Sequence, residues 1–316
     1  MAANMSNNKS LSGFARIGEG VFVIIFCVEI LILGNNCAFA QAANSAKLEF
    51  YVTNPWIYLI SSFIGGVEVE VIPLQVWNSN GDLVRAEINR NRNFLQNLDQ
   101  EARVIALDEQ DMIDSGLANN NLANNLANER NVRNVRILYS KFPIEINNIS
   151  DPSIIPFVAQ RVLVVLSEWD AANYPYYQRR LAEFQARLSS SILAGQILKG
   201  VSICAMSSTS GILLQAAGCK VERPEPEILE QWRRGKLSGL REYLNEKKSR
   251  DVIIIADDDM PRNLKKYLLA RSDVFYWQRP QLDDKTDYPS FLHEQYISLW
   301  QRIIKKPLPR SQRSKK

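Results

Sequence analysis

The chain of 316 residues contains a single histidine, His293. Ser–His–Asp and Cys–His catalytic arrangements both need an imidazole beside the nucleophile. His293 falls in a stretch where Leu292, Tyr296 and Leu299 have the spacing of an amphipathic helix, so we expect it on a helix surface. No catalytic constellation can be assembled around it, and we expect a protein that is not an enzyme.

Long apolar runs are also scarce. The run from Val21 to Gly34 has about fourteen residues, whereas a membrane-spanning helix needs about twenty. Lys9 and Arg16 precede it and Ala38-Phe39-Ala40 follows it, which is the pattern of an export signal. We therefore expect export to the periplasm with cleavage after Ala40, or a membrane tether if the signal stays uncleaved.

Cysteine is rare as well, and two of the four, Cys27 and Cys37, belong to the expected signal segment. Cys204 and Cys219 would remain in an oxidising compartment, where disulfides persist. Their spacing across one predicted strand–helix–strand step allows a disulfide only if their Cα atoms lie within about 7 Å. The sequence leaves open a disulfide or two buried thiols.

Acidic residues are missing from the last sixteen positions, which carry seven Lys and Arg residues. Subtracting these seven charges from the net charge of +4 leaves −3 for the rest of the chain. Such tails are typically solvated and disordered, and the alternative is a peripheral contact with a membrane or another protein. We expect no nucleic-acid partner.

What is abundant is alternation between short apolar runs and helix-sized stretches, which indicates parallel sheets covered by helices. Two consecutive helical patterns without an intervening strand, at 156–169 and 177–192, separate the two halves. The predicted fold class is α/β, with two lobes that each hold a parallel sheet flanked by helices, joined by a long linker helix. The predicted strands are 48–53, 67–72, 103–107, 135–139, 201–205, 219–222, 251–255 and 274–277.

A weak surface helix is also expected in the Asn-, Leu- and Ala-rich segment 117–134. The same alternation of strand and helix patterns predicts the domain boundaries. The boundaries are a signal peptide at 1–40, an N-terminal αβ lobe at 41–156, linker helices at 157–198, a C-terminal αβ lobe at 199–304 and a basic disordered tail at 305–316.

Several local patterns carry a resemblance to a known family. Asp151-Pro152-Ser153 is followed by Tyr176-Tyr177, and Gly65-Gly66 precedes an alternating strand that ends in Ile72-Pro73-Leu74. Pro224-Glu225-Pro226 lies in the second half. In this order, the patterns resemble the solute-binding proteins of zinc and manganese ABC importers, across roughly residues 47 to 304. The resemblance implies an ABC permease and ATPase as partners.

In that family a metal ion lies between the lobes on His and Asp or Glu side chains. Transferred one by one, the ligand positions fall at Asp82, Ser153, Ser207 and Gln278. Hydroxyl and amide oxygens are poor ligands for Zn²⁺, so Asp82 alone is left as a candidate metal ligand. The resemblance therefore implies Zn²⁺ or Mn²⁺ as cargo, whereas these residues argue against metal binding. We expect the four positions to line a cleft.

Two polar segments follow predicted strands of the second half. Asp257-Asp258-Asp259 could help to bind a hard cation, but capping of the helix that begins near Pro261 is the favoured interpretation. Ser207-Ser208-Thr209-Ser210-Gly211 resembles an anion-binding turn at a helix start. It lacks the lysine of a phosphate loop, so we interpret it as a polar wall for a small solute.

Two functions remain. The first is an exported solute-binding protein of the metal-importer type, whose cargo is a metal at a rebuilt site, another small molecule, or nothing. The alternative is a non-transporting envelope interaction or assembly protein that kept this fold.

Overall fold

The computed structural model describes residues 47–78, 82–86, 102–117, 134–142, 149–283 and 287–305. The predicted signal peptide, residues 118–133 of the predicted weak helix and the tail beyond Lys305 lie outside these residues. Within the described part, no helix has both the length and the apolar character needed to cross a membrane.

The first lobe contains a four-stranded, fully parallel sheet in the order β2-β1-β5-β6. Strand β1 pairs on both sides: Val52 lies opposite Pro73 of β2 and opposite Ile105 of β5. Phe50 and Val52 are fully buried, as expected for a strand covered on both faces. The strands are β1 (Leu48–Val52), β2 (Val69–Pro73), β5 (Val104–Ala106) and β6 (Val135–Ile137).

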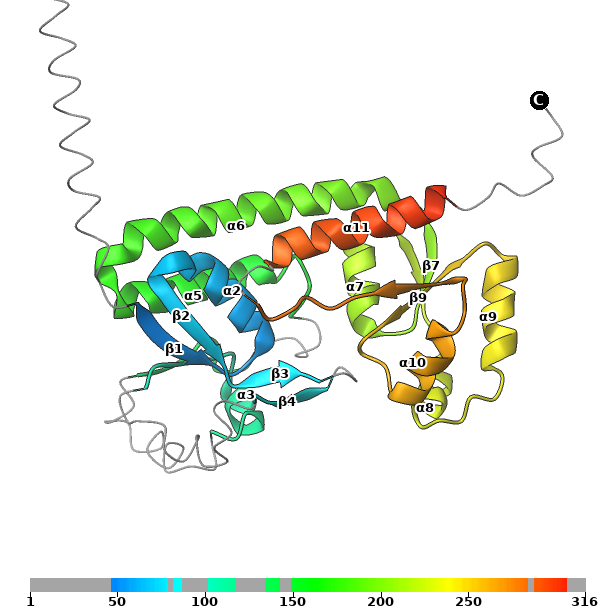
Figure 1. The fold of residues 1–316 in the computed structure, drawn as a ribbon, viewed down its shortest axis with the longest axis horizontal. Coiled ribbons are helices and arrows are strands. Elements are labelled where there is room, and N and C mark those ends of the chain that lie inside the picture. Colours follow the sequence, from blue (N-terminus) through cyan, green and yellow to red (C-terminus); the bar gives the residue numbers. More distant parts are fainter. Residues whose placement is uncertain are drawn as a thin grey trace, which may run out of the picture. The chain divides into compact units, whose positions relative to one another are not determined.

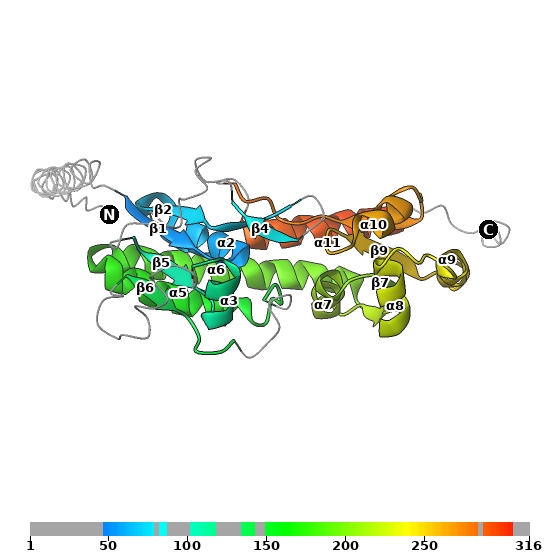
Figure 2. The ribbon, with the colours of Figure 1, turned by 90° about the horizontal axis from the view of Figure 1, so that it is seen from below.

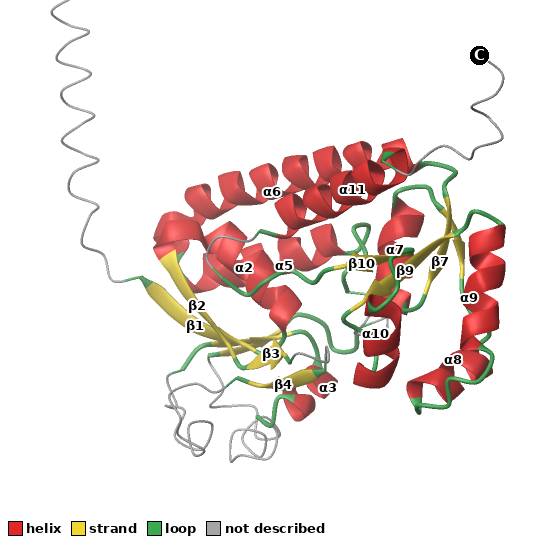
Figure 3. Ribbon diagram, turned by 45° about the vertical axis from the view of Figure 1, so that its right-hand side comes forward, coloured by secondary structure: helices red, strands yellow, loops and turns green. Residues whose placement is uncertain are grey.

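The second lobe repeats this arrangement. Its parallel sheet has the order β8-β7-β9-β10, so the first strand of the lobe again lies between the second and the third. Figure 3 shows the two sheets as separate groups of strands. The strands are β7 (Ser202–Ala205), β8 (Lys220–Glu222), β9 (Ile253–Asp257) and β10 (Val274–Trp277).

Two long helices run past both lobes side by side (Figures 1 and 2). They are α6 (Tyr174–Gly195) and α11 (Tyr288–Ile304), and both begin beside the first lobe and end beside the second. Ser191 Oγ donates to the Pro289 carbonyl oxygen at 2.8 Å and so ties the two helices together. Shorter helices complete the lobes: α2 (Pro55–Gly65), α3 (Glu109–Asp114), α5 (Ile155–Trp169), α7 (Ser208–Ala216), α8 (Pro226–Arg233), α9 (Leu240–Ser249) and α10 (Arg262–Leu269).

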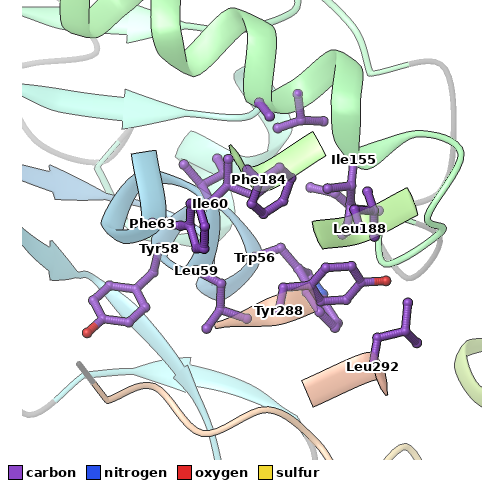
Figure 4. Close-up of a cluster of buried hydrophobic side chains, with 14 of the residues drawn as sticks. Trp56, Tyr58, Leu59, Ile60, Phe63, Ile155, Phe184, Leu188, Tyr288 and Leu292 are labelled. Atoms are coloured by element: carbon purple, nitrogen blue, oxygen red, sulfur yellow. The ribbon is translucent and has the colours of Figure 1, made fainter. Parts of the chain in front are cut away.

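The main core gathers around α2, which is apolar on almost every face and is therefore buried between other elements. Figure 4 shows its side chains together with Phe184 and Leu188 of α6 and Tyr288 of α11. Phe63 and Phe184 pack edge to face, with ring centroids 5.2 Å apart. One continuous cluster of buried apolar side chains therefore joins the first sheet to the two long helices.

The α/β fold with two parallel sheets is confirmed, and every predicted strand is present, with the predicted bounds at 274–277 and shifted ends elsewhere. Helix α8 and the antiparallel ribbon of β3 (Gln75–Trp77) and β4 (Leu83–Arg85) were not predicted. The Cys204 and Cys219 side chains are buried free thiols, which resolves the alternative that the sequence left open. The domain boundaries drawn from the sequence stay predictions.

Candidate functional site

In each lobe, the loop after the first strand carries a hydroxyl that donates to a buried aspartate. Thr53 Oγ1 bonds the Asp111 carboxylate in the first lobe, and Ser207 Oγ bonds that of Asp257 in the second. Burial raises the pKa of both carboxyls, and the hydroxyl hydrogen bonds oppose the rise. The two pairs anchor the loops at the carboxyl ends of the strands, where open α/β sheets place ligands.

The same loops start helices that face this edge. Asn54 Oδ1 accepts the Trp56 N–H at 2.9 Å and caps α2, while Ser207 Oγ accepts the Ser210 N–H at 3.3 Å and caps α7. Side-chain oxygens at these positions satisfy N–H groups that the first helical turn leaves unpaired. The caps set where Trp56 and the first residues of α7 lie.

Between these loops lies a cavity of about 600 Å³, which is within the size range of small-molecule sites. The first lobe contributes two indole rings and one acid, and the second contributes hydroxyls, one acid and three arginines. Its main polar and aromatic lining residues are Trp56, Trp77, Asp82, Ser208, Thr209, Arg233, Asp259, Arg262 and Arg279.

Arg279 connects the two walls of this cavity. Its guanidinium forms an ion pair with the Asp259 carboxylate and lies 5.2 Å from the centroid of the Trp77 ring. Trp77 packs in turn on Trp56, with ring centroids 5.1 Å apart. Burial lowers the pKa of Arg279, and the nearby carboxylates of Asp258, Asp257 and Asp82 oppose this change. An arginine keeps its charge at neutral pH, so Arg279 and Asp259 form a fixed ion pair in the cavity wall.

The three consecutive aspartates do not have the helix-capping role that the sequence analysis favoured for them. Pro261 precedes α10 without any side-chain cap, so the predicted capping role is wrong. Asp257 Oδ1 accepts the Asp259 N–H at 2.9 Å, and Asp258 bonds Lys265 and Tyr276. With Asp259 paired to Arg279 and Asp257 bonded to Ser207, each carboxylate has a partner outside α10 or on its side chains, and none caps the helix N-terminus.

The structure brings only one of the four predicted cleft residues to this cavity. Asp82 lines it and also closes the β3–β4 ribbon, where its N–H donates to Asn78 Oδ1 at 3.0 Å. Ser207 is buried just behind the wall that Ser208 and Thr209 form. Its hydroxyl is used by Asp257 and by the α7 cap.

The other two predicted residues lie elsewhere. Ser153 is exposed and donates from both Oγ and its backbone N–H to Asp151 Oδ1 at 2.8 Å. Gln278 is exposed and lines a second, more open space, while its N–H donates to Gln295 Oε1 at 3.2 Å. Neither contributes to the cavity of the three arginines.

The sequence did not lead us to predict the cavity residues Trp77, Arg233, Arg262 and Arg279. Arg279 lies two residues beyond the end of β10, and residues just after a parallel strand reach the ligand edge of the sheet. That position could have indicated its role. Arg233 and Arg262 carried no such signal, because the first lies on the unpredicted helix α8 and the second is a helical residue, the first of α10.

Metal-ligand geometry is not found among the residues that the structure describes. Nowhere in them do three or more His, Cys, Asp or Glu side chains cluster closely enough to hold a metal ion. His293 is exposed on α11, as predicted.

No protein-family model matches the chain, and no curated protein sequence matches it. Solved structures do match. The solute-binding protein FpvC of Pseudomonas aeruginosa, in complex with Mn²⁺, is 16% identical with a TM-score of 0.52, covering 82% of this chain and 99% of its own. ZnuA is 15% identical with a TM-score of 0.55, covering 80% and 98%.

A further match is the laminin-binding protein Lmb of Streptococcus agalactiae, described as a bifunctional protein with adhesin and metal-transporting activity. It is 13% identical with a TM-score of 0.54, and the match covers 82% of this chain and all of that one. The chain therefore has the fold of the metal-binding solute-binding proteins, over nearly their whole length.

Proposed function

We propose that this chain is an exported solute-binding protein that captures a solute other than a bare divalent metal ion and delivers it to a membrane permease and its ATPase. The fold supports solute binding, and the cavity lies at the ligand edge of both sheets. The observation that carries the proposal is the guanidinium of Arg279, which is ion-paired with Asp259 inside the cavity.

The excess of arginines over carboxylates on the cavity lining disfavours a free dication. At an effective dielectric constant of about 20, a divalent ion about 4 Å from a guanidinium is repelled by about 8 kcal/mol. Asp259 offsets this repulsion for Arg279, with which it is paired, and is therefore not available to a metal ion. The repulsion from Arg233 and Arg262 is opposed by Asp82, the other carboxylate on the lining. Zn²⁺ and Mn²⁺ sites use several imidazole or carboxylate ligands at once. The donor set of this cavity does not match that requirement.

Metal titration tests the proposal. The full chain is expressed with its amino-terminal segment and recovered from the periplasmic fraction, and mass spectrometry then reads where the chain begins. A start at Gln41 would support export with cleavage after Ala40. Calorimetry and native mass spectrometry against Zn²⁺, Mn²⁺ and Ca²⁺ should show no binding tighter than about 1 μM, which corresponds to about −8 kcal/mol.

Two variants make the metal test specific. Asp82→Asn removes the charge but keeps an oxygen that can accept from Asn78, whereas Asp114→Asn changes an exposed acid of α3 outside the cavity. Sub-micromolar Zn²⁺ or Mn²⁺ binding that Asp82→Asn abolishes and Asp114→Asn preserves would refute the proposal. It would instead establish a rebuilt metal site.

The second candidate is an envelope interaction protein that kept the fold. It is favoured by the match to Lmb, whose described activities include adhesion. A chain that binds neither metals nor small solutes, and whose gene has no permease or ATPase gene beside it, would support this candidate over solute capture.

A further inference from the structure

We infer that the solute is a small organic anion with at least two oxyanion groups, held by Arg233 and Arg262. This inference rests on the proposed function, because it names the cargo of the same cavity. Cation and anion charges are unequal on the cavity lining, which has three arginines and two aspartates. Since Arg279 and Asp259 neutralise each other, Arg233 and Arg262 face the single acid Asp82.

Within the described part of the chain, the donors of these two arginines are largely unused. Arg233 Nη2 donates to the Asp259 carbonyl oxygen at 3.0 Å, and neither Arg233 nor Arg262 forms an ion pair with any residue that the structure describes. A guanidinium has five N–H donors arranged to match the two oxygens of a carboxylate or phosphate group. Both side chains are exposed to solvent, so a solute can reach them without a change in the core.

The place of Arg262 adds an electrostatic reason. It is the first residue of α10, where the partial positive charge of a helix start makes a cation unfavourable. An anion bound there would interact with the guanidinium and the helix start together. Ser208 and Thr209, in the first turn of α7, line the same cavity and add hydroxyls. This is the turn whose sequence resembles an anion-binding loop.

The rest of the cavity lining indicates the size of the solute and the chemistry of the part between its charged groups. Trp56 and Trp77 add indole rings to the cavity lining, and a cavity of about 600 Å³ exceeds what a single inorganic ion needs. Two arginines on separate helices favour two oxyanion groups on one molecule. A polycarboxylate such as citrate has this chemistry, either free or as a chelate whose outer oxygens carry the negative charge around a metal ion.

The inference is tested with citrate, its Fe³⁺ complex and inorganic phosphate, titrated separately into the full chain recovered from the periplasm. We expect one of the two citrate forms to bind at least tenfold more tightly than phosphate, with affinity that falls as NaCl rises. The form that binds shows whether the protein captures the free acid or its metal chelate. Tighter binding of phosphate would refute the requirement for two groups.

Matched variants locate the binding. Arg233→Gln and Arg262→Gln should each weaken citrate binding at least tenfold, whereas Arg241→Gln, an exposed arginine of α9 that does not line the cavity, should not. All three substitute exposed residues, so thermal unfolding should be unchanged. Binding that survives both cavity substitutions would overturn the inference.

Failure of this inference can be told apart from failure of the proposed function. If none of the anions binds, but native mass spectrometry finds a neutral or cationic organic molecule held by the protein and released by substitutions at Trp77, then solute capture stands and the anion inference falls. If bare Zn²⁺ or Mn²⁺ binds below about 1 μM through Asp82, the proposed function and the anion inference both fall.

Discussion

Replacing Arg279 by methionine tests the ion pair on which the chemistry of the cavity depends. Methionine keeps the unbranched apolar stem of the side chain and removes the charge. The guanidinium and the Asp259 carboxylate are 14% and 19% exposed, so the pair is largely buried. Removing one partner leaves the other as an unpaired charge with little solvation, which is the costly part of such a substitution.

The expected magnitude follows from two contributions. Breaking a buried pair typically costs about 3–5 kcal/mol, and losing the contact with the Trp77 ring costs about 0.5–1 kcal/mol. Since both groups retain some exposure, we expect a loss of about 3 kcal/mol in the free energy of unfolding for Arg279→Met. The double variant with Asp259→Asn has no unpaired charge, and should lie within about 1 kcal/mol of the original protein.

Urea unfolding followed by circular dichroism measures all four members of this cycle. The coupling energy between the two positions should be at least about 2 kcal/mol. If Arg279→Met changes the free energy of unfolding by less than about 0.5 kcal/mol, or if the two substitutions are additive, the pair is not a buried interaction. The argument against a metal cargo would then lose its basis.

Two further predictions concern other parts of the fold. Burial raises the pKa of Asp257, so the folded state keeps a proton that the unfolded state releases above about pH 4. Between about pH 4 and the raised pKa of the folded state, the free energy of unfolding therefore falls by about 1.4 kcal/mol per pH unit. Asp257→Asn should flatten this dependence in urea midpoints measured between pH 4 and 7, and an unchanged slope would contradict the assignment. At Gly195, a Cβ atom would come 2.8 Å from Tyr296 Cδ2, so Gly195→Ala should destabilise the protein by about 1–3 kcal/mol, while the exposed neighbour Ser190→Ala should be neutral by thermal unfolding.

The sequence predicted the fold well because its signals are local. The strand around Ile254 is a continuous apolar run, and the helical spacing of Tyr177, Leu181 and Phe184 defines α6 directly. Helix α8 escaped prediction because its short amphipathic pattern follows Pro224 and Pro226, which indicate a loop.

The site was harder to predict because it depends on which partner each charge finds. Nothing local indicates that Asp259 pairs with Arg279, twenty residues later in the chain, in preference to the N-terminus of α10. Transfer of positions from the resembling family placed Gln278 in the cleft, whereas the next residue is the one that lines it. A shift of one residue at the end of a strand reverses the direction of a side chain, which family spacing alone does not resolve.

The contact between the long helices α6 and α11 affects the rates at which a solute can bind and leave. A hinge that swung the lobes widely apart would have to bend both helices and break the contact between Ser191 and Pro289. Bending a helix strains its hydrogen bonds, so we expect solute entry to depend on local movements of the side chains that join the two walls, those of Trp77 and Arg279. Association and release rates should therefore depend on these two side chains, and the residence time of the solute on how often the contact between Arg279 and Trp77 opens.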